Sequence, residues 1–224
     1  MGNHEKIPFF GADAFSFSAL ADEMGLVIPR HAAAQFACHA EMVVKANRAM
    51  NLTAITEPVQ MAVKHYLDCA MISLYLPGTG LVLDIGSGAG FPAIPLKIIS
   101  PDIRLTLMDA SRKKVHFLQH VIRTLALSDT AAIHARAPDM RPALSGHYDA
   151  VICRAVAGIE TILSMGLPFL KPDGLIVAMK GGDFASKEAD GIQRISPDVT
   201  HHIHHYKLPL GYGARTIVIL QKRS

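Results

Sequence analysis

The chain has 224 residues, half of them hydrophobic and 18% charged, with a formal net charge of +3. That length excludes two α/β domains of common size, and the apolar content excludes a disordered chain. Three cysteines without Cys-x-x-Cys spacing exclude a disulfide framework and a zinc finger, and no apolar run reaches the roughly 18 residues that a membrane span requires.

The first third of the chain has a helical pattern. From about Phe15 to Tyr75, apolar positions recur at helical spacing and no strand alternation interrupts them. Pro58 suits the first turn of a helix, and Pro77-Gly78 ends the helical pattern. We therefore predict a helical region over residues 1–76 and a cofactor-binding core over residues 77–224.

From Leu81 onward, short β-rich runs alternate with helical stretches, of which the first begins at about Pro92 and the second covers RKKVHFLQHVIRTLAL. The β-rich runs are LVLDIG, RLTLMDA, AAIHA, YDAVICRA, GLIVAMKG, HHIHHYKL and RTIVILQK. Such alternation predicts a doubly wound α/β fold with a mostly parallel, seven-stranded sheet. The last two runs are joined by the Gly-rich turn PLGYGA, which predicts an antiparallel hairpin, and so one antiparallel edge strand.

The sharpest motif is an apolar strand, LVLDI, that runs into the glycine loop GSGAG at residues 86–90. Glycines let a backbone turn tightly and approach a ligand without interference from a Cβ atom. A dinucleotide-binding fingerprint would place its third glycine at position 91, where this chain has Phe91. With Asp84 at the strand tip, the loop resembles the first motif of the Rossmann-like class I methyltransferases, which bind S-adenosylmethionine. The candidate cofactor contacts here are Asp84, Gly86, Ser87, Gly88, Gly90 and Phe91.

Two further acids follow predicted strands. Asp109 ends the second strand, where a carboxylate can accept hydrogen bonds from both ribose hydroxyls. The alternative for Asp109 is a helix N-cap, because a helix follows at Ser111. After the third strand, Asp139 could accept a hydrogen bond from the amine of an adenine, or it could be a solvated loop acid.

Several segments together resemble the bacterial glucose-inhibited division protein B family, which methylates N7 of one guanine in 16S ribosomal RNA. They are NLTAI, VKHYLD, LDIGSGAGFPAIPLKI, LMDASRKKVHFL, ICRAVAG and LKPDGLIVAMKG. The resemblance implies cofactor contacts at Gly86, Gly88, Phe91, Ala137, Pro138 and Arg154. It also implies 16S ribosomal RNA, or a small ribosomal subunit particle, as the partner. The chain departs from the family at Pro138, where an acid is usual, and at Ala93, where many members have glycine.

Guanine N7 carries a lone pair and no proton, so in-line methyl transfer to it needs no general base. The segment Cys153-Arg154-Ala155-Val156 stands where methyltransferases of exocyclic amines often carry Asn/Asp-Pro-Pro-Tyr/Phe. Cys153 ends an apolar run and is interpreted as a small buried residue. Arg154 is the positioning residue that we expect at the reaction centre. It could hold the cofactor carboxylate, as the family suggests, donate to guanine O6, fix a phosphate, or pair with a carboxylate such as Asp84.

An RNA substrate requires cations, because phosphates dominate nucleic-acid binding. The candidates near predicted strand tips and helix starts are Lys64, His65, Arg112, Lys113, Lys114, Lys180 and Arg215. The run His201-His202-Ile203-His204-His205 invites a metal interpretation, but alternate residues of a strand point to opposite faces, so an edge strand without metal is expected.

Three other functions remain open: a class I methyltransferase of a small molecule or protein, a nicotinamide-dependent oxidoreductase, and a noncatalytic cofactor-binding module in ribosome assembly. Phe91, at the position of the third glycine, disfavours the oxidoreductase. A soluble cytoplasmic monomer without membrane contact is expected in each case.

Overall fold

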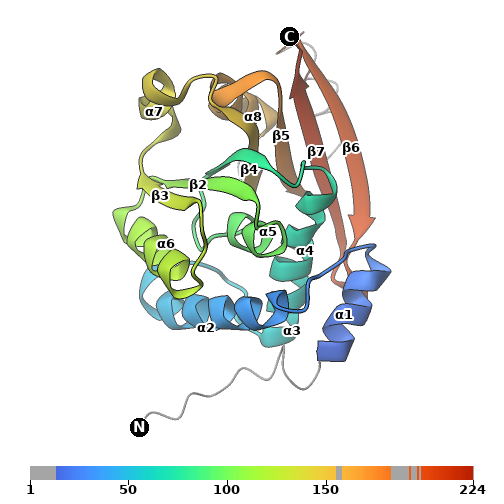
Figure 1. Cartoon of the computed structure of the whole chain (residues 1–224). Coiled ribbons are helices and arrows are strands. Elements are labelled where there is room, and N and C mark those ends of the chain that lie inside the picture. Colours follow the sequence, from blue (N-terminus) through green and yellow to red (C-terminus); the bar gives the residue numbers. More distant parts are fainter. Residues whose placement is uncertain (1–13, 155–157, 183–191, 193–195, 197, 224) are drawn as a thin grey trace.

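The computed structural model describes residues 14–154, 158–182, 192, 196 and 198–223. Seven strands form one sheet in the order β3-β2-β1-β4-β5-β7-β6 (Figure 1). The strands are β1 (Gly80–Ile85), β2 (Ile103–Asp109), β3 (Thr130–His134), β4 (Tyr148–Arg154), β5 (Leu170–Gly181), β6 (Val199–Lys207) and β7 (Ala214–Lys222). The seven strands predicted from the sequence are therefore confirmed.

The sheet is mixed at one side only. Strands β1 to β5 are parallel where they pair, and β7 runs antiparallel to both β5 and β6. The predicted hairpin is confirmed as β6 and β7, with the histidine-rich β6 outermost. Among β5, β6 and β7, only β7 runs in the reversed direction. The chain forms the outer strand β6 first and then returns as β7 between β5 and β6.

The helices lie on both faces of the sheet. Strand residues alternate between two hydrophobic clusters, so that Val82 and Ile152 belong to one and Leu83 and Val151 to the other. The first cluster takes in α2, α5 and α6, and the second takes in α7 and α8, as the two sides of the sheet in Figure 1 show. A sheet with two apolar faces requires this double cover.

Helix bounds follow local signals in the sequence. Glu57 caps α3 by accepting hydrogen bonds from the backbone N–H groups of residues 59 and 60, and Pro58 takes the first helical position as predicted. The helical elements are α1 (Ala14–Glu23), α2 (Ala32–Met50), α3 (Pro58–Met61), the π-helix η2 (Ala62–Leu67), α4 (Asp68–Ala70), η3 (Met71–Leu74), α5 (Ala93–Ile99), α6 (Arg112–Thr124), α7 (Ala137–Leu144), α8 (Ile159–Gly166), η4 (Leu167–Phe169) and η5 (Pro209–Gly211).

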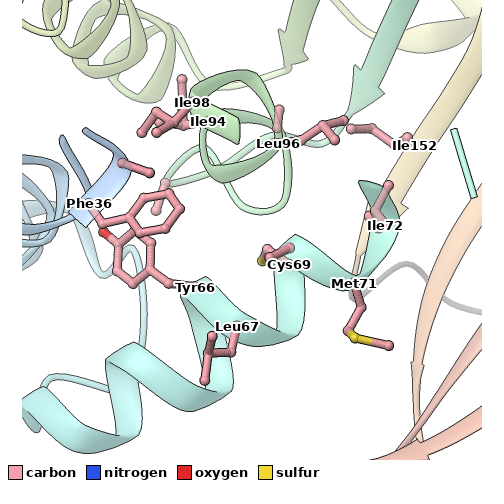
Figure 2. Packing of buried hydrophobic residues seen from close by; sticks show 14 of the residues in the cluster. Phe36, Tyr66, Leu67, Cys69, Met71, Ile72, Ile94, Leu96, Ile98 and Ile152 are labelled. Carbon is pink, nitrogen blue, oxygen red and sulfur yellow. The ribbon is translucent and has the colours of Figure 1, made fainter. Parts of the chain in front are cut away.

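The N-terminal helices share a core with the sheet. Phe36 of α2 packs against Tyr66 of η2 with ring centroids 4.9 Å apart, and both side chains are fully buried. Figure 2 shows these rings next to Ile94 of α5, while Ile72 of η3 lies near Ile152 of β4. This continuous apolar contact fixes the helices over the sheet edge where β1, β2 and β4 end.

Candidate active site

The glycine loop is held against the neighbouring strand by its own backbone. The N–H groups of Gly86 and Ser87 both donate to the carbonyl of Met108, at 2.8 and 3.1 Å. Gly90 has φ +94°, and a Cβ there would lie 2.5 Å from Cγ1 of Ile94, so the loop cannot carry a larger residue at this point. At Gly86, with φ +79°, a Cβ would meet nothing within 4 Å. The loop is therefore packed at its helix end and open at its strand end.

Asp84 lies at the end of β1 with its carboxylate buried and unsatisfied. The residue is 1% exposed, and neither carboxylate oxygen has a hydrogen-bond partner in the described part of the chain. Burial raises the pKa of Asp84 to about 8; the charge of Asp109 adds to the rise, and the Ser87 hydroxyl opposes it. An unpaired buried carboxylate is costly, so its position beside the open side of Gly86 fits a ligand with a positive charge.

Asp109 ties the glycine loop to the next helix. One carboxylate oxygen accepts from the N–H of Gly88 at 2.9 Å, and the other accepts from the N–H of Ser111 at 2.8 Å. The N-cap residue of α6 is Ser111 and not Asp109. Asp109 instead accepts the hydrogen bond from the Ser111 N–H. A carboxylate has about four acceptor positions, and two of them remain for a ligand.

The third candidate group begins α7. Ala137 is 4% exposed at the first helical position, and Pro138 follows it. Asp139 is exposed in the first turn, where its N–H donates to the carbonyl of Arg136. The structure thus places Asp139 at the surface next to the end of β3.

Phe91 packs toward the N-terminal helices. Its ring stacks on His65 at 4.3 Å between centroids with a 20° angle between planes. It also lies edge-on to Tyr66 and against His39, at 5.4 and 5.2 Å. Phe91 therefore joins the glycine loop to η2 and α2, a contact that the sequence motif did not indicate.

His39 supports the loop from beneath, and sequence reasoning did not single it out. Its Nε2 lies 2.9 Å from the carbonyl oxygen of Ala89, and its Nδ1 lies 3.0 Å from the Tyr66 hydroxyl. Since a carbonyl only accepts, Nε2 carries the proton and Nδ1 accepts from Tyr66. Burial lowers the pKa of His39 to about 4, which keeps the ring neutral. The one signal in the sequence is a histidine inside an apolar helical stretch.

Replacing His39 with leucine should destabilise the protein and loosen the glycine loop. The substitution removes the donor of the buried Ala89 carbonyl, at a cost of about 1 to 3 kcal/mol, and it also removes the hydrogen bond between His39 and the Tyr66 hydroxyl. The loss, measured by urea unfolding, should shrink as the pH falls from 6.5 toward 4. In that window the unfolded wild-type protein binds a proton at His39 that the folded protein excludes, so wild-type stability declines.

Tyr66→Phe is the matched control for this experiment, because it keeps the bond between His39 and Ala89. We expect it to retain the acid dependence that His39→Leu loses. An identical pH profile for the leucine variant and the wild-type protein would contradict a neutral, buried His39.

Arg154 ends β4, and its guanidinium is directed at the N-terminal helices. Nη1 donates to Nδ1 of His65 at 3.0 Å, and Nη2 donates to the Lys64 carbonyl at 2.6 Å. The ion pair that sequence reasoning considered is formed with Asp68, at 3.2 Å, and not with Asp84. Asp68 reaches Arg154 because η2 and α4 cross the end of β4, a contact that no local sequence pattern predicts.

Asp68 is the second residue that sequence reasoning missed, although it closes the VKHYLD segment. Its carboxylate is 2% exposed and accepts from the Tyr206 hydroxyl at 2.6 Å, and Nε of Arg215 lies 3.6 Å away. Burial raises the pKa of Asp68, and Arg154, Tyr206 and Arg215 oppose the rise. One carboxylate thus joins α4 to three strands.

The remaining cations are spread along the same edge. Arg112 and Lys113 are exposed in the first turn of α6, and Lys114 and Lys180 are half-buried. Lys64 donates to Gln60 and lies 4.8 Å above the Tyr212 ring. His65 is 7% exposed, and both of its nitrogens are engaged, because Nε2 lies 2.8 Å from the Thr53 hydroxyl. The structure therefore places His65 beneath the surface, where it supports Arg154.

The expectation of a small buried residue at Cys153 is confirmed: the residue is 4% exposed, and burial raises the pKa of its thiol to about 12. Ala155 and Val156 of the neighbouring motif lie outside the described residues. Within the described ranges, no group of three or more His, Cys, Asp or Glu side chains could hold a metal ion. No helix among those residues is long and apolar enough to cross a bilayer.

The strand order, the reversed β7 and the glycine loop after β1 define the class: this is the fold of class I S-adenosylmethionine-dependent methyltransferases. A family model described as rRNA small subunit methyltransferase G matches residues 32–205. The chain belongs to this family.

Individual relatives agree with the family match. Ribosomal RNA small subunit methyltransferase G of Geotalea uraniireducens is 36% identical over 205 residues, which cover 90% of this chain and 93% of the relative. The protein of the same name from Desulforamulus reducens is 38% identical over 209 residues, covering 90% and 87%. A SAM-dependent methyltransferase from Aquifex aeolicus has a similar fold, with a TM-score of 0.56 and 14% identity over 76% of this chain and 96% of its own.

Proposed function

We propose that this chain transfers a methyl group from S-adenosylmethionine to N7 of one guanine in 16S ribosomal RNA, by in-line displacement without a general base. As a family member, the chain is an S-adenosylmethionine-dependent methyltransferase of small-subunit ribosomal RNA. The observation that carries the proposal is the unpaired, buried Asp84 carboxylate beside the open glycine loop. We also propose that it acts as a cytoplasmic monomer, with a helical region over residues 1–76 and a cofactor-binding core over residues 77–224.

The residues around the loop fit this cofactor. When bound, S-adenosylmethionine supplies a methyl group that its sulfonium makes electrophilic. Asp84 offers a negative charge to the positively charged donor, and Asp109 has free acceptor positions for ribose hydroxyls. Gly86 leaves room for a close approach, and Asp139 can accept from an adenine amine. We also propose cofactor contacts at Ser87, Gly88, Gly90, Phe91, Ala137 and Pro138.

Side chains near Asp84 are poorly suited to remove a proton. Burial raises the pKa of the Cys69 thiol and that of the Cys153 thiol to about 12. Burial and the Arg154 charge lower the pKa of His65 to about 3, so its ring stays neutral and bound on both sides. Apart from Asp84, whose carboxylate we assign to the positively charged donor, these described side chains offer no free base, and guanine N7 carries no proton that a base would have to remove. An amine or hydroxyl substrate would fit this site less well.

We predict that Asp109→Ala weakens the binding of S-adenosylhomocysteine by about tenfold or more. The change removes the ribose acceptor and also releases the N–H groups of Gly88 and Ser111. Calorimetric titration measures the affinity, and Ser111→Ala serves as the control because it keeps the backbone N–H that Asp109 binds. Equal affinity of folded Asp109→Ala and wild-type protein would refute this role.

The decisive experiment maps methylated nucleotides in 16S ribosomal RNA from cells with and without the gene. Purified protein is then given labelled S-adenosylmethionine and unmodified small subunits. We expect one guanine to lose its N7 methyl group in the deletion strain and to regain it from the purified protein. Label on a protein or a small molecule alone would assign the other enzymatic function, and bound cofactor without any transfer would assign a noncatalytic assembly module.

A further inference from the structure

The buried carboxylate of Asp68 contacts two arginines and a tyrosine from three different strands. They lie at the end of the sheet where β4 ends and β7 begins. Oδ2 of Asp68 lies 3.2 Å from Nη2 of Arg154 and 3.6 Å from Nε of Arg215, while Oδ1 accepts from Tyr206. Arg154 is the last residue of β4, Tyr206 is next to last in β6, and Arg215 is second in β7. Asp68 thus holds two guanidinium groups next to each other over one half of the sheet.

The charges of this cluster do not balance. Arginine stays protonated in proteins, so two positive charges share one negative charge. The Asp68 side chain is only 2% exposed, whereas the side chains of Arg154 and Arg215 are 19% and 24% exposed. The four Nη hydrogens of Arg154 are taken by His65, Cys69, the Lys64 carbonyl and Asp68. Arg215 uses Nη1 for the Ala214 carbonyl and, within the described residues, keeps Nη2 for a ligand, so the surplus positive charge can attract an anion at Arg215. Planar guanidinium groups bind phosphate oxygens with well-directed hydrogen bonds.

Arg154 is connected to the glycine loop through His65, which stacks on Phe91, but the other strands of the cluster lie beyond β4. Strand β1, which carries Asp84, and strand β2, which carries Asp109, lie on one side of β4, and the strands of Tyr206 and Arg215 lie on the other. Lys64, whose carbonyl accepts from Arg154, adds a further charge above the Tyr212 ring. These groups therefore lie beside the proposed cofactor site, on the β5 and β7 side of β4.

We propose that Arg215 forms a subsite that binds one backbone phosphate of the RNA, and that Asp68, held in place by Arg154 and Tyr206, is the positioning residue that orients Arg215. The inference rests on the proposed function, since it concerns the nucleotide chain that carries the target guanine. The cofactor carboxylate is the other anion that Arg215 could bind, and the experiment separates the two.

The first test is Arg215→Gln, assayed with unmodified small ribosomal subunits over a range of salt concentrations. Loss of one phosphate contact should lower the salt slope of RNA binding by about one and raise KM for the subunit about tenfold. We expect kcat at saturating RNA and the affinity for S-adenosylhomocysteine to stay at wild-type values. Lys171→Gln is the matched control, because it also removes one positive charge from an ion pair. That pair, with Asp149, lies at the other end of the strands, where β4 and β5 begin.

The second test separates positioning from charge. Asp68→Asn adds one unit of positive net charge, so simple attraction predicts tighter RNA binding, whereas a positioning role predicts weaker binding and a higher KM. Because Asp68→Asn disturbs a buried cluster and can unfold the protein, Tyr206→Phe provides a milder variant. It removes one hydrogen bond from Asp68 without any change of charge, and a smaller rise in KM is expected.

Several outcomes would overturn the subsite. They are an unchanged salt slope and KM in Arg215→Gln, tighter RNA binding in folded Asp68→Asn, or a fall in the S-adenosylhomocysteine affinity of Arg215→Gln, which would assign Arg215 to the cofactor carboxylate. The control variant also counts against the subsite if Lys171→Gln changes the slope equally. A wild-type protein that methylates no RNA would overturn the proposed function instead, and is recognised before any variant is compared.

Discussion

Asp84→Asn should make the ligand-free protein more stable and at the same time abolish its binding of S-adenosylmethionine. The wild-type carboxylate is buried without a hydrogen-bond partner in the described part of the chain, and burial raises its pKa to about 8. A neutral amide of the same shape avoids the cost of a buried charge. The amide also lacks the negative charge that a cationic ligand would pair with. The free energy of unfolding should therefore rise while the affinity for the cofactor falls.

The stability of the wild-type protein should depend on pH through Asp84. Between about pH 4 and pH 8 the unfolded chain has lost the Asp84 proton while the folded chain keeps it, so wild-type stability falls as the pH rises through this window. The stability advantage of Asp84→Asn should therefore grow up to about pH 8 and then level off. Wild-type affinity for the cofactor should rise over the same window, because deprotonation of Asp84 creates the charge that attracts it.

Urea unfolding and calorimetric titration at several pH values measure these two effects. Asp22→Asn provides the control, because Asp22 is exposed on α1 and its neutralisation should leave the free energy of unfolding nearly unchanged. A folded Asp84→Asn protein that is less stable than the wild-type protein at pH 8 would contradict the unpaired state of this carboxylate.

Arg154→Ala should abolish methyl transfer and should also lower the free energy of unfolding by about 3 kcal/mol. The position of Arg154 at a strand tip predicts only the loss of transfer. The structure adds the stability cost, because removal of the guanidinium leaves Asp68 buried with fewer partners and leaves the Lys64 carbonyl and His65 without their donor. Methyl transfer to small subunits and urea unfolding measure the two losses separately.

Arg154→Lys distinguishes charge from geometry. A lysine keeps the positive charge near Asp68, but it lacks the planar fork that reaches His65 and the Lys64 carbonyl together. We expect it to recover part of the stability and little of the transfer. The stability losses of Arg154→Ala and Asp68→Asn should combine to less than their sum, because both remove the same contact. Full additivity would show that the two side chains act independently.

The sequence by itself determined the elements and the cofactor-loop motif. Alternation of β-rich and helical runs predicted the seven strands, the Gly-rich turn PLGYGA predicted the β6 and β7 hairpin, and Pro58 marked a helix start. The spacing of glycines at 86, 88 and 90 predicted a ligand loop, and Gly86 and Gly90 adopt the positive φ values that such a loop needs. These signals are local, because helix period, strand alternation and turn chemistry depend on residues that are near one another in the chain.

Only the tertiary structure decided which side chains meet. His39 and the carbonyl of Ala89 are 50 residues apart, and Tyr206 and Asp68 are 138 residues apart. Such pairs form because α2, η2 and α4 pack across the ends of the strands, so the partner of each polar group depends on helix packing and not on neighbouring residues in the chain. For the same reason the sequence left Arg154 with a choice of partners, and the unpaired state of Asp84 became visible only when the whole core was assembled around it.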